Sequence, residues 1–187
     1  MDGTESRVTG AAWDTLTAMS PWLAPERGKT ARVPDDERNS LESWLEYHRA
    51  TLLIKCAGLT PEQLATRSCP PSLLSLLGLV RHMAEVETWF HAFDGQPEGV
   101  FYYSEDRPDA DFEDVDPRRA DQDLAIYQAS VERSRAAVAD RSLDDLMPGP
   151  GQPTSLRWVY QHMIEEYARH NGHADLIRER IDGVTGA

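Results

Sequence analysis

The residues of this chain that could do chemistry gather near its carboxyl end. Its six histidines include His162, His170 and His173, and these three share the stretch 162–175 with Glu166. An α-helix turns by about 100° per residue and so places the four side chains within an arc of about 80°. Imidazole and carboxylate groups on one helix face are typical ligands of a divalent metal ion.

Distance along the helix axis limits which of these side chains can share one ion. His162 and His170 would lie about 12 Å apart along the axis, whereas bonds from zinc to nitrogen or oxygen measure about 2.0 to 2.2 Å. Three near pairs remain, which are His162 with Glu166, Glu166 with His170, and His170 with His173.

The apolar pattern of the same segment favours the pair of Glu166 and His170. His170 fills the missing step of a stripe that repeats every three or four residues, and Glu166 lies at the edge of that stripe. A carboxylate there is costly unless it is paired or bound to a cation. We interpret His162 and His173 as pocket residues or as hydrogen-bond partners of the ligands. The stripe consists of Leu156, Tyr160, Met163, Tyr167, Ala174, Ile177 and Ile181.

His82 is the third candidate ligand, because it too stands where a core residue is expected. Leu79 precedes it by three positions, and Val86 and Trp89 follow it by four and seven. Helix axes in a bundle lie about 8 to 10 Å apart, so His82 can reach a pair on another helix. Two nitrogens and one carboxylate leave coordination positions for water or substrate. A hydrogen-bonded core histidine gives the same pattern, and the residues alone leave both interpretations open.

Five helical segments are predicted to position these residues. The first begins near Asp35, where acidic residues favour a helix start, and ends before Gly58. Thr60 opens a short helix with a capping box, Ser72 caps the next helix, and Gly183 stops the last one. The segments span residues 35–57, 61–67, 72–93, 118–140 and 156–182.

A long connection, residues 94–117, separates the second and third long helices. It exceeds the usual short turn between neighbouring helices, and we therefore predict an all-α four-helix bundle with a long crossover between its second and third helices. The crossover carries the aromatic residues 101–103 and many acidic residues. It is either a lid over the site or a solvated connection with its aromatic residues packed on the bundle. Gly78 either admits a close neighbour or is a tolerated surface glycine.

The length of 187 residues suits one domain. We predict the bundle over residues 35–183 and a partly mobile N-terminal extension over residues 1–34, in which residues 13–22 form a weak helix or a docking arm. No apolar run approaches the roughly 20 residues that span a bilayer, and the first residues lack the pattern of a secretory signal. These features predict a cytoplasmic protein.

Charge and cysteine content exclude several classes of partner. The net charge of −13 repels phosphate backbones and anionic membrane surfaces, so we expect neither nucleic acid nor membrane as a partner. Cys56 and Cys69 form no metal-binding CxxC motif, and we interpret both as buried or incidental thiols. His48 and His91 are interpreted as surface or helix-end residues.

Two segments of the chain resemble the DinB-like superfamily, in particular its actinobacterial branch. They are Leu-Leu-Gly-Leu-Val-Arg-His-Met-Ala-Glu-Val-Glu at residues 76–87 and His-Met-Ile-Glu-Glu-Tyr-Ala-Arg-His-Asn-Gly-His-Ala-Asp at residues 162–175. The resemblance covers roughly residues 35 to 182 and implies His82, Glu166 and His170 as metal ligands. Many members have three histidines, and the glutamate here looks like the ligand set of the mycothiol-dependent maleylpyruvate isomerases, in their N-terminal domain.

The resemblance implies a divalent-metal-dependent S-transferase that uses a low-molecular-weight thiol such as mycothiol. A metal-bound thiolate would attack an electrophilic small molecule. Zinc is the expected metal, with nickel and manganese as alternatives. A non-catalytic, stress-related protein that binds a metal or ligand, and a metal-dependent hydrolase, are the competing functions. Relatives commonly dimerise, so a homodimer is an open alternative.

Three arginines are candidates for recognising an anionic substrate or the carboxyl groups of the thiol. They are Arg81, Arg169 and Arg49, and each is also compatible with an exposed helix surface.

Overall fold

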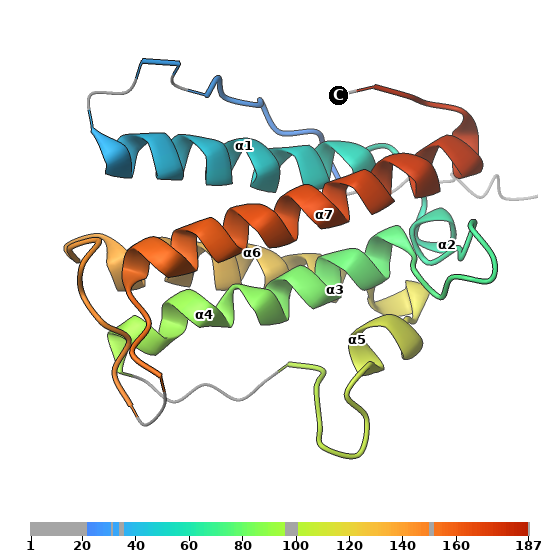
Figure 1. Cartoon of the computed structure of the whole chain (residues 1–187). Helices are drawn as coiled ribbons and strands as arrows, with labels where there is room; N and C mark the ends of the chain where they lie inside the picture. The colour runs from blue at the N-terminus through green and yellow to red at the C-terminus, as the bar shows by residue number, and fades with distance from the viewer. Residues whose placement is uncertain (1–21, 31, 34–35, 96–100, 150–151, 187) are drawn as a thin grey trace, which may run out of the picture.

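Helices account for the regular structure of the residues that can be described. The computed structural model describes residues 22–30, 32–33, 36–95, 101–149 and 152–186. Within these ranges the segments of regular structure are helices, and the β-pairing is confined to two isolated bridges. The long helices pack as a bundle (Figure 1), which confirms the all-α prediction. Residues 13–21 of the predicted arm lie outside the described residues.

The first and last helices make the most extensive helix–helix contact in the bundle. Helix α1 spans Glu37–Cys56, and helix α7 spans Leu156–Asp182 beside it (Figure 1). The Asp36 side chain caps α1 by accepting a hydrogen bond from the Asn39 amide. Ser155 caps α7 in the same way, and Gly183 ends it with a φ of 77°. The predicted bounds of α7 are therefore confirmed.

The second long helix differs from the prediction at its start and in its middle. Its cap is Ser75, whose hydroxyl accepts from the Gly78 amide, and Ser72 lies in the preceding loop. Leu73 is 49% exposed and does not join the core face. The helix is also interrupted at Glu87, where the Phe90 amide donates to the Glu87 carbonyl only three residues earlier. The pieces are α3 (Leu76–Val86), α4 (Thr88–His91) and the 3-10 turn η1 (Ala92–Asp94).

A short helix precedes this region, and a longer one follows the crossover. Helix α2 (Pro61–Leu64) has the predicted capping box between Thr60 and Gln63. The 3-10 turn η2 (Pro117–Arg119) leads into α6 (Ala120–Val138), which packs against α3 and α4. Both the capping box and the third long helix were predicted from the sequence.

The crossover packs closely on α3 over part of its length. It contains a one-turn helix, α5 (Ala110–Glu113), and Phe101 and Tyr102 pack against the core as expected. A Cβ atom added to Gly78 would lie 3.2 Å from the Ser75 hydroxyl and 3.4 Å from the Phe112 ring. Gly78 therefore admits a close neighbour, and that neighbour is the crossover.

The described part of the N-terminal extension lies along α1 (Figure 1). Trp22 is buried in the core, and its carbonyl accepts a hydrogen bond from the Gly58 amide. The Arg27 guanidinium lies 4.6 Å from the centre of the Tyr47 ring. Residues 22–30 thus have defined contacts with the bundle, and the predicted boundary at residues 34 and 35 stays a prediction.

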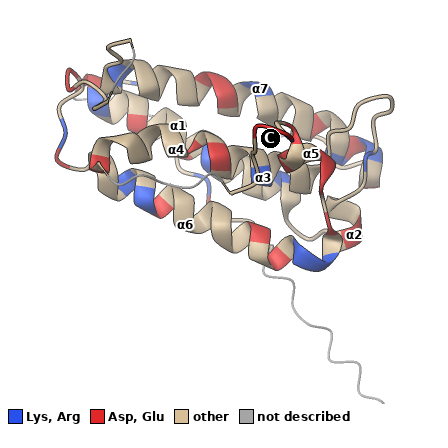
Figure 2. Ribbon diagram, turned by 90° about the horizontal axis from the view of Figure 1, so that it is seen from below, with Lys and Arg blue, Asp and Glu red and all other residues tan. Residues whose placement is uncertain are grey.

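Charges of both signs are interspersed along the outer faces of the bundle. Figure 2 shows acidic segments near one end of α6 and both acidic and basic segments towards its other end, with an uncharged stretch between them. Among the described residues, no helix combines the length and the apolar character that a membrane span requires.

Candidate metal centre

The three candidate ligands meet between α3 and α7, which pack against each other (Figure 1). His82 comes from α3, and Glu166 and His170 come from adjacent turns of α7. One potential ligand atom from each side chain lies within 4.8 Å of the other two. The structure therefore brings together the two nitrogens and one carboxylate that the sequence selected, and we call these residues the ligand cluster.

A carboxylate from the crossover holds the ring of His82. The His82 Nδ1 atom lies 2.7 Å from the Asp111 Oδ2 atom, and the Asp111 side chain is only 9% exposed. A buried carboxylate that accepts a hydrogen bond from Nδ1 fixes the ring orientation and the tautomer. It leaves Nε2 as the nitrogen that can face a bound cation.

Arg81 fastens the crossover to α3 and is not an exposed helix arginine. Its Nε and Nη2 atoms each donate to a backbone carbonyl of α5, those of Asp111 and Ala110, at 2.8 Å. Its Nη1 atom lies 3.3 Å from Asp123, and the guanidinium stacks on the Tyr102 ring at 3.9 Å. The buried Arg81 thereby keeps Asp111 beside His82.

His170 is the most deeply buried member of the ligand cluster, with 8% of its surface exposed. Burial first, and then the nearby side chains of His82, His173 and Arg169, lower the pKa of its imidazole to about 3. The ring is therefore neutral near pH 7, which is the form that binds a metal ion. Its Nε2 atom lies 3.5 Å from a carboxylate oxygen of Glu166.

The remaining predicted residues of α7 surround the cluster. The Nδ1 atoms of His173 and His170 lie 3.4 Å apart, so His173 is a direct neighbour of His170. The Arg169 Nη1 atom lies 3.3 Å from Glu166, and Arg169 is exposed. His162 lies on the other side of Glu166 and stacks on Trp158, with 4.9 Å between ring centres.

Phe112 and Asp111 are the residues that the sequence analysis missed. The centre of the Phe112 ring lies 4.8 Å from that of His82 and 6.5 Å from that of His170. The crossover thus lies over the histidines and also packs its aromatic residues on the bundle. Neither residue belongs to a periodic pattern in the sequence, and no motif could have indicated its place at the site.

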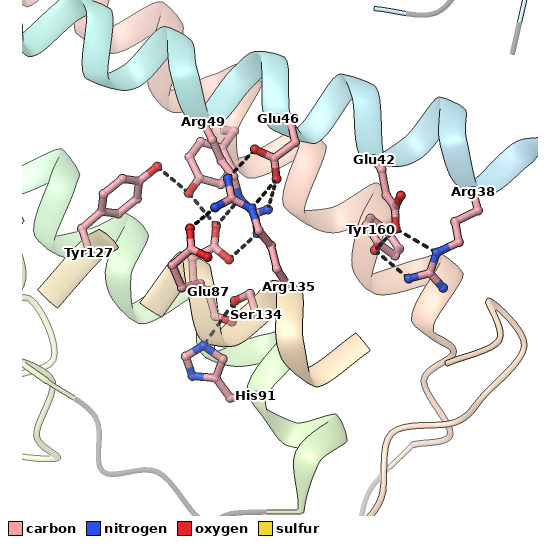
Figure 3. Close-up of polar contacts among 12 residues, drawn as sticks. Arg38, Glu42, Glu46, Arg49, Glu87, His91, Tyr127, Ser134, Arg135 and Tyr160 are labelled. Atoms are coloured by element: carbon pink, nitrogen blue, oxygen red, sulfur yellow. Dashed lines mark hydrogen bonds and ion pairs between the residues drawn. The ribbon is translucent and has the colours of Figure 1, made fainter. Parts of the chain in front are cut away.

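Arg49 lies in a separate buried network and is not available to a ligand of the metal cluster. Its Nη2 and Nε atoms lie 2.5 and 2.9 Å from the two carboxylate oxygens of Glu87. The Tyr167 hydroxyl donates to Glu87 at 2.6 Å, and Tyr127 bonds Tyr167 at 3.0 Å. Figure 3 shows Arg49, Glu46 and Glu87 converging with Arg135 between the helices. We call Arg49, Glu87, Tyr127 and Tyr167 the arginine network.

His91 and Cys56 are both buried. His91 ends α4, as one of its two interpretations had it, but it is not a surface residue, because its Nε2 lies 2.9 Å from the Ser130 carbonyl and 3.2 Å from the Ser134 hydroxyl. Burial raises the pKa of the Cys56 thiol to about 12. Cys56 is therefore protonated and unsuited to act as a nucleophile.

A family model described as mycothiol-S-transferase matches residues 40–183. The chain belongs to this family. The family lies within the DinB-like superfamily, so the resemblance seen in the sequence is confirmed. Neither the curated proteins nor the solved structures contain a match to the chain. The matched region includes all three residues of the ligand cluster.

Proposed function

We propose that this protein is a divalent-metal-dependent transferase that joins a low-molecular-weight thiol, mycothiol, to an electrophilic small molecule. The observation that carries the proposal is the convergence of His82, Glu166 and His170 within 4.8 Å, in a chain of the mycothiol-S-transferase family.

The donor set fits a catalytic metal ion. His82 and His170 would provide imidazole nitrogens and Glu166 a carboxylate oxygen, which is a ligand set of catalytic zinc sites that keep an open position. Asp111 on His82 supplies the carboxylate partner that such ligands commonly have. We propose zinc as the metal, with nickel and manganese as the alternatives that the same donors accept.

These three side chains would hold the divalent ion, whose chemical contribution would be to lower the pKa of a thiol near neutral pH. The chain's own residues hold the ligand geometry, because Arg81 and Asp111 fix the crossover and His82 together. The Phe112 ring packs against the His82 ring, with 4.8 Å between their centres, and adds an apolar wall beside the site.

The proposed reaction balances without a protein nucleophile or an external oxidant. The thiol sulfur forms a bond to the electrophilic carbon, and the thiol proton leaves to solvent. The leaving group departs with the electron pair of the bond that breaks. The buried thiol of Cys56 takes no part, because its pKa of about 12 keeps it protonated.

The test measures conjugate formation by the zinc-loaded protein with mycothiol and a model electrophile. We expect a rate well above that of the thiol and electrophile alone, and a loss of at least about 100-fold in Glu166→Gln, as for removal of an essential charge-stabilising group. Glu179→Gln is the matched control, since Glu179 is an exposed glutamate on the same helix.

Three outcomes distinguish the competing functions. No acceleration with mycothiol or other thiols, under loading with zinc, nickel or manganese, contradicts the transferase and favours a binding protein. Consumption of an ester or amide substrate without any thiol indicates a hydrolase. Equal activity in Glu166→Gln and in the wild type contradicts the role of the ligand cluster.

A further inference from the structure

Three aromatic rings form a second feature on the face that carries the ligand cluster. Trp89 of α4 lies 5.5 Å from Trp158 and 5.1 Å from His162, measured between ring centres. Trp158 and His162 of α7 are stacked at 4.9 Å with an angle of 21° between their planes. We call Trp89, Trp158 and His162 the aromatic cluster, and neither tryptophan takes part in the reaction proposed above.

The aromatic cluster is continuous with the ligand cluster. Trp158, His162 and Glu166 follow one another at intervals of four residues on α7 and so share one side of the helix. One ring nitrogen of His162 and one carboxylate oxygen from each of Glu165 and Glu166 lie within 4.8 Å of one another. Glu166 lies about 6 Å along the axis from His162 and about 12 Å from Trp158. A molecule of modest length can therefore touch both clusters.

The two tryptophans leave much of their indole surface in water. Trp158 is 45% exposed and Trp89 is 37% exposed, whereas Trp22 is 2% exposed in the core. A ligand that covers adjacent exposed apolar groups removes their surface from water, which favours binding. Indole and imidazole faces favour other planar rings, through offset stacking or edge-to-face contact.

The charges beside the aromatic cluster limit the kind of ring that it can hold. Glu165 and Glu166 lie on the same part of α7, and Arg169 donates a hydrogen bond to each of them. A carboxylate or phosphate on the ring would meet these two carboxylates. An uncharged ring avoids that repulsion.

We propose that the aromatic cluster binds an uncharged aromatic ring of the electrophile and directs the reactive carbon toward the ligand cluster. This inference rests on the proposed transferase function and adds a substrate class to it. The substrates are electrophiles whose reacting carbon lies about one helical turn, about 5 to 6 Å, from the ring.

Two epoxides test this substrate class because they differ only away from the reacting carbon. Phenyl glycidyl ether and methyl glycidyl ether carry the same epoxide group and differ in the phenyl or methyl group on the ether oxygen. In both, the sulfur bonds to the terminal carbon, the carbon–oxygen bond breaks with its electrons on oxygen, and the thiol proton ends on that oxygen. We expect the zinc-loaded wild type to show kcat/KM at least about tenfold higher for the phenyl compound, after correction for the uncatalysed rates.

Substitutions of the aromatic cluster should remove this preference. Trp158→Ala and Trp89→Ala are each expected to lower the ratio of kcat/KM for the phenyl compound to kcat/KM for the methyl compound by about fivefold or more. An effect of about fivefold corresponds to the loss of one contact between aromatic rings. Trp44→Ala is the matched control, because Trp44 is 43% exposed on α1 and stacks on His48 instead. Trp158→Phe should retain part of the preference, which separates loss of the ring from loss of folding.

A binding measurement keeps this inference separate from the proposed function. The unreactive diol 3-phenoxypropane-1,2-diol should quench the indole fluorescence of the wild type in a saturable way, and its methoxy analogue should not. The saturable quenching should disappear in Trp158→Ala.

The outcomes then decide each statement separately. Turnover of both epoxides with a ratio near one, or a ratio unchanged in both alanine variants, overturns the inference and leaves the transferase standing. If neither epoxide turns over, the transferase fails and its substrate class fails with it. In that case the diol measurement decides alone whether the aromatic cluster is a ring-binding site, and absent quenching overturns that statement too.

Discussion

The arginine network and the ligand cluster differ in how fully protein groups hydrogen-bond the carboxylate that each contains. In the arginine network, both carboxylate oxygens of Glu87 accept hydrogen bonds from Arg49, and Tyr167 donates to one of them as well. In the ligand cluster, the shortest contact between Glu166 and His170 is 3.5 Å, longer than a good charge-assisted hydrogen bond.

This difference indicates what each cluster is built to hold. The arginine network is closed, since Arg49 of α1 and Tyr167 of α7 bond the Glu87 carboxylate, and Tyr127 of α6 in turn bonds the Tyr167 hydroxyl (Figure 3). The ligand cluster is open, since acceptor atoms from α3 and α7 converge on one point. We infer that the first cluster stabilises the fold by itself, whereas the second is completed by a cation.

The largest expected effect comes from breaking the closed network. Glu87→Gln removes the charge that balances Arg49 in the interior, and we expect the free energy of unfolding to fall by about 3 to 5 kcal/mol. Urea unfolding at pH 7 measures this loss. His170→Leu in protein treated with a chelator should change the same quantity by less than about 1.5 kcal/mol, because a neutral ring is replaced by an apolar residue of the same stripe.

Equal losses in these two variants would contradict the comparison. They would mean that the ligand cluster is as complete without a cation as the arginine network is with its own residues.

The next largest effect is expected at the crossover, where Asp111 contacts His82. Asp111→Asn removes the carboxylate from His82 Nδ1, and we expect the affinity for zinc to fall by about 10- to 100-fold. Calorimetric titration measures the affinity, and circular dichroism checks the helix content. Asp109→Asn serves as the control because Asp109 is exposed two residues earlier on the same segment. An unchanged affinity in Asp111→Asn would exclude Asp111 as a positioning residue.

The smallest effect is a pH dependence that belongs to the arginine network. Burial, and then the charge of Glu87, raises the pKa of Tyr167 well above its usual value. The unfolded chain therefore loses this proton near pH 10 while the folded protein keeps it. The stability from Tyr167 is complete below about pH 10 and is lost as the pH rises further, by up to about 1.4 kcal/mol per pH unit.

Tyr167→Phe should accordingly flatten the loss of stability between about pH 10 and 11. Urea unfolding across this range measures the slope for the variant and the wild type. Tyr103→Phe is the control, since Tyr103 is 47% exposed. An equal slope in Tyr167→Phe and the wild type would show that Tyr167 does not carry the effect.

The sequence predicted those parts of the fold and site that depend on periodicity along one helix. The apolar stripe of α7 left one position for His170 and an edge position for Glu166, and both lie where the stripe places them. The same reasoning expected His82 at a core position of α3; its ring lies against that of His170, but its side chain is 23% exposed and so only partly buried. Helical geometry alone carries this information, so no knowledge of the tertiary fold was needed.

Features that depend on contacts between distant segments were not predictable in this way. Ser72 and Ser75 both precede the same apolar run, so the run alone does not distinguish them, and the structure has Ser75 as the cap. Asp111 and Phe112 come from the one-turn helix α5 in the crossover, which is too short for a repeat to indicate which side chain faces inward. The break after Val86 accompanies the burial of Glu87, which depends on residues of three other helices.

The central claim is that His82, Glu166 and His170 form a divalent-metal site, and metal stoichiometry tests it most directly. Protein treated with a chelator and titrated with zinc should bind one ion per chain at the ligand cluster. Saturation at about 100 times Kd should raise the free energy of unfolding by about 2.7 kcal/mol. The variants His82→Ala, Glu166→Gln and His170→Leu should keep their helix content and lose both effects. A wild type that binds no zinc, nickel or manganese, or three variants that bind zinc as the wild type does, would contradict the account.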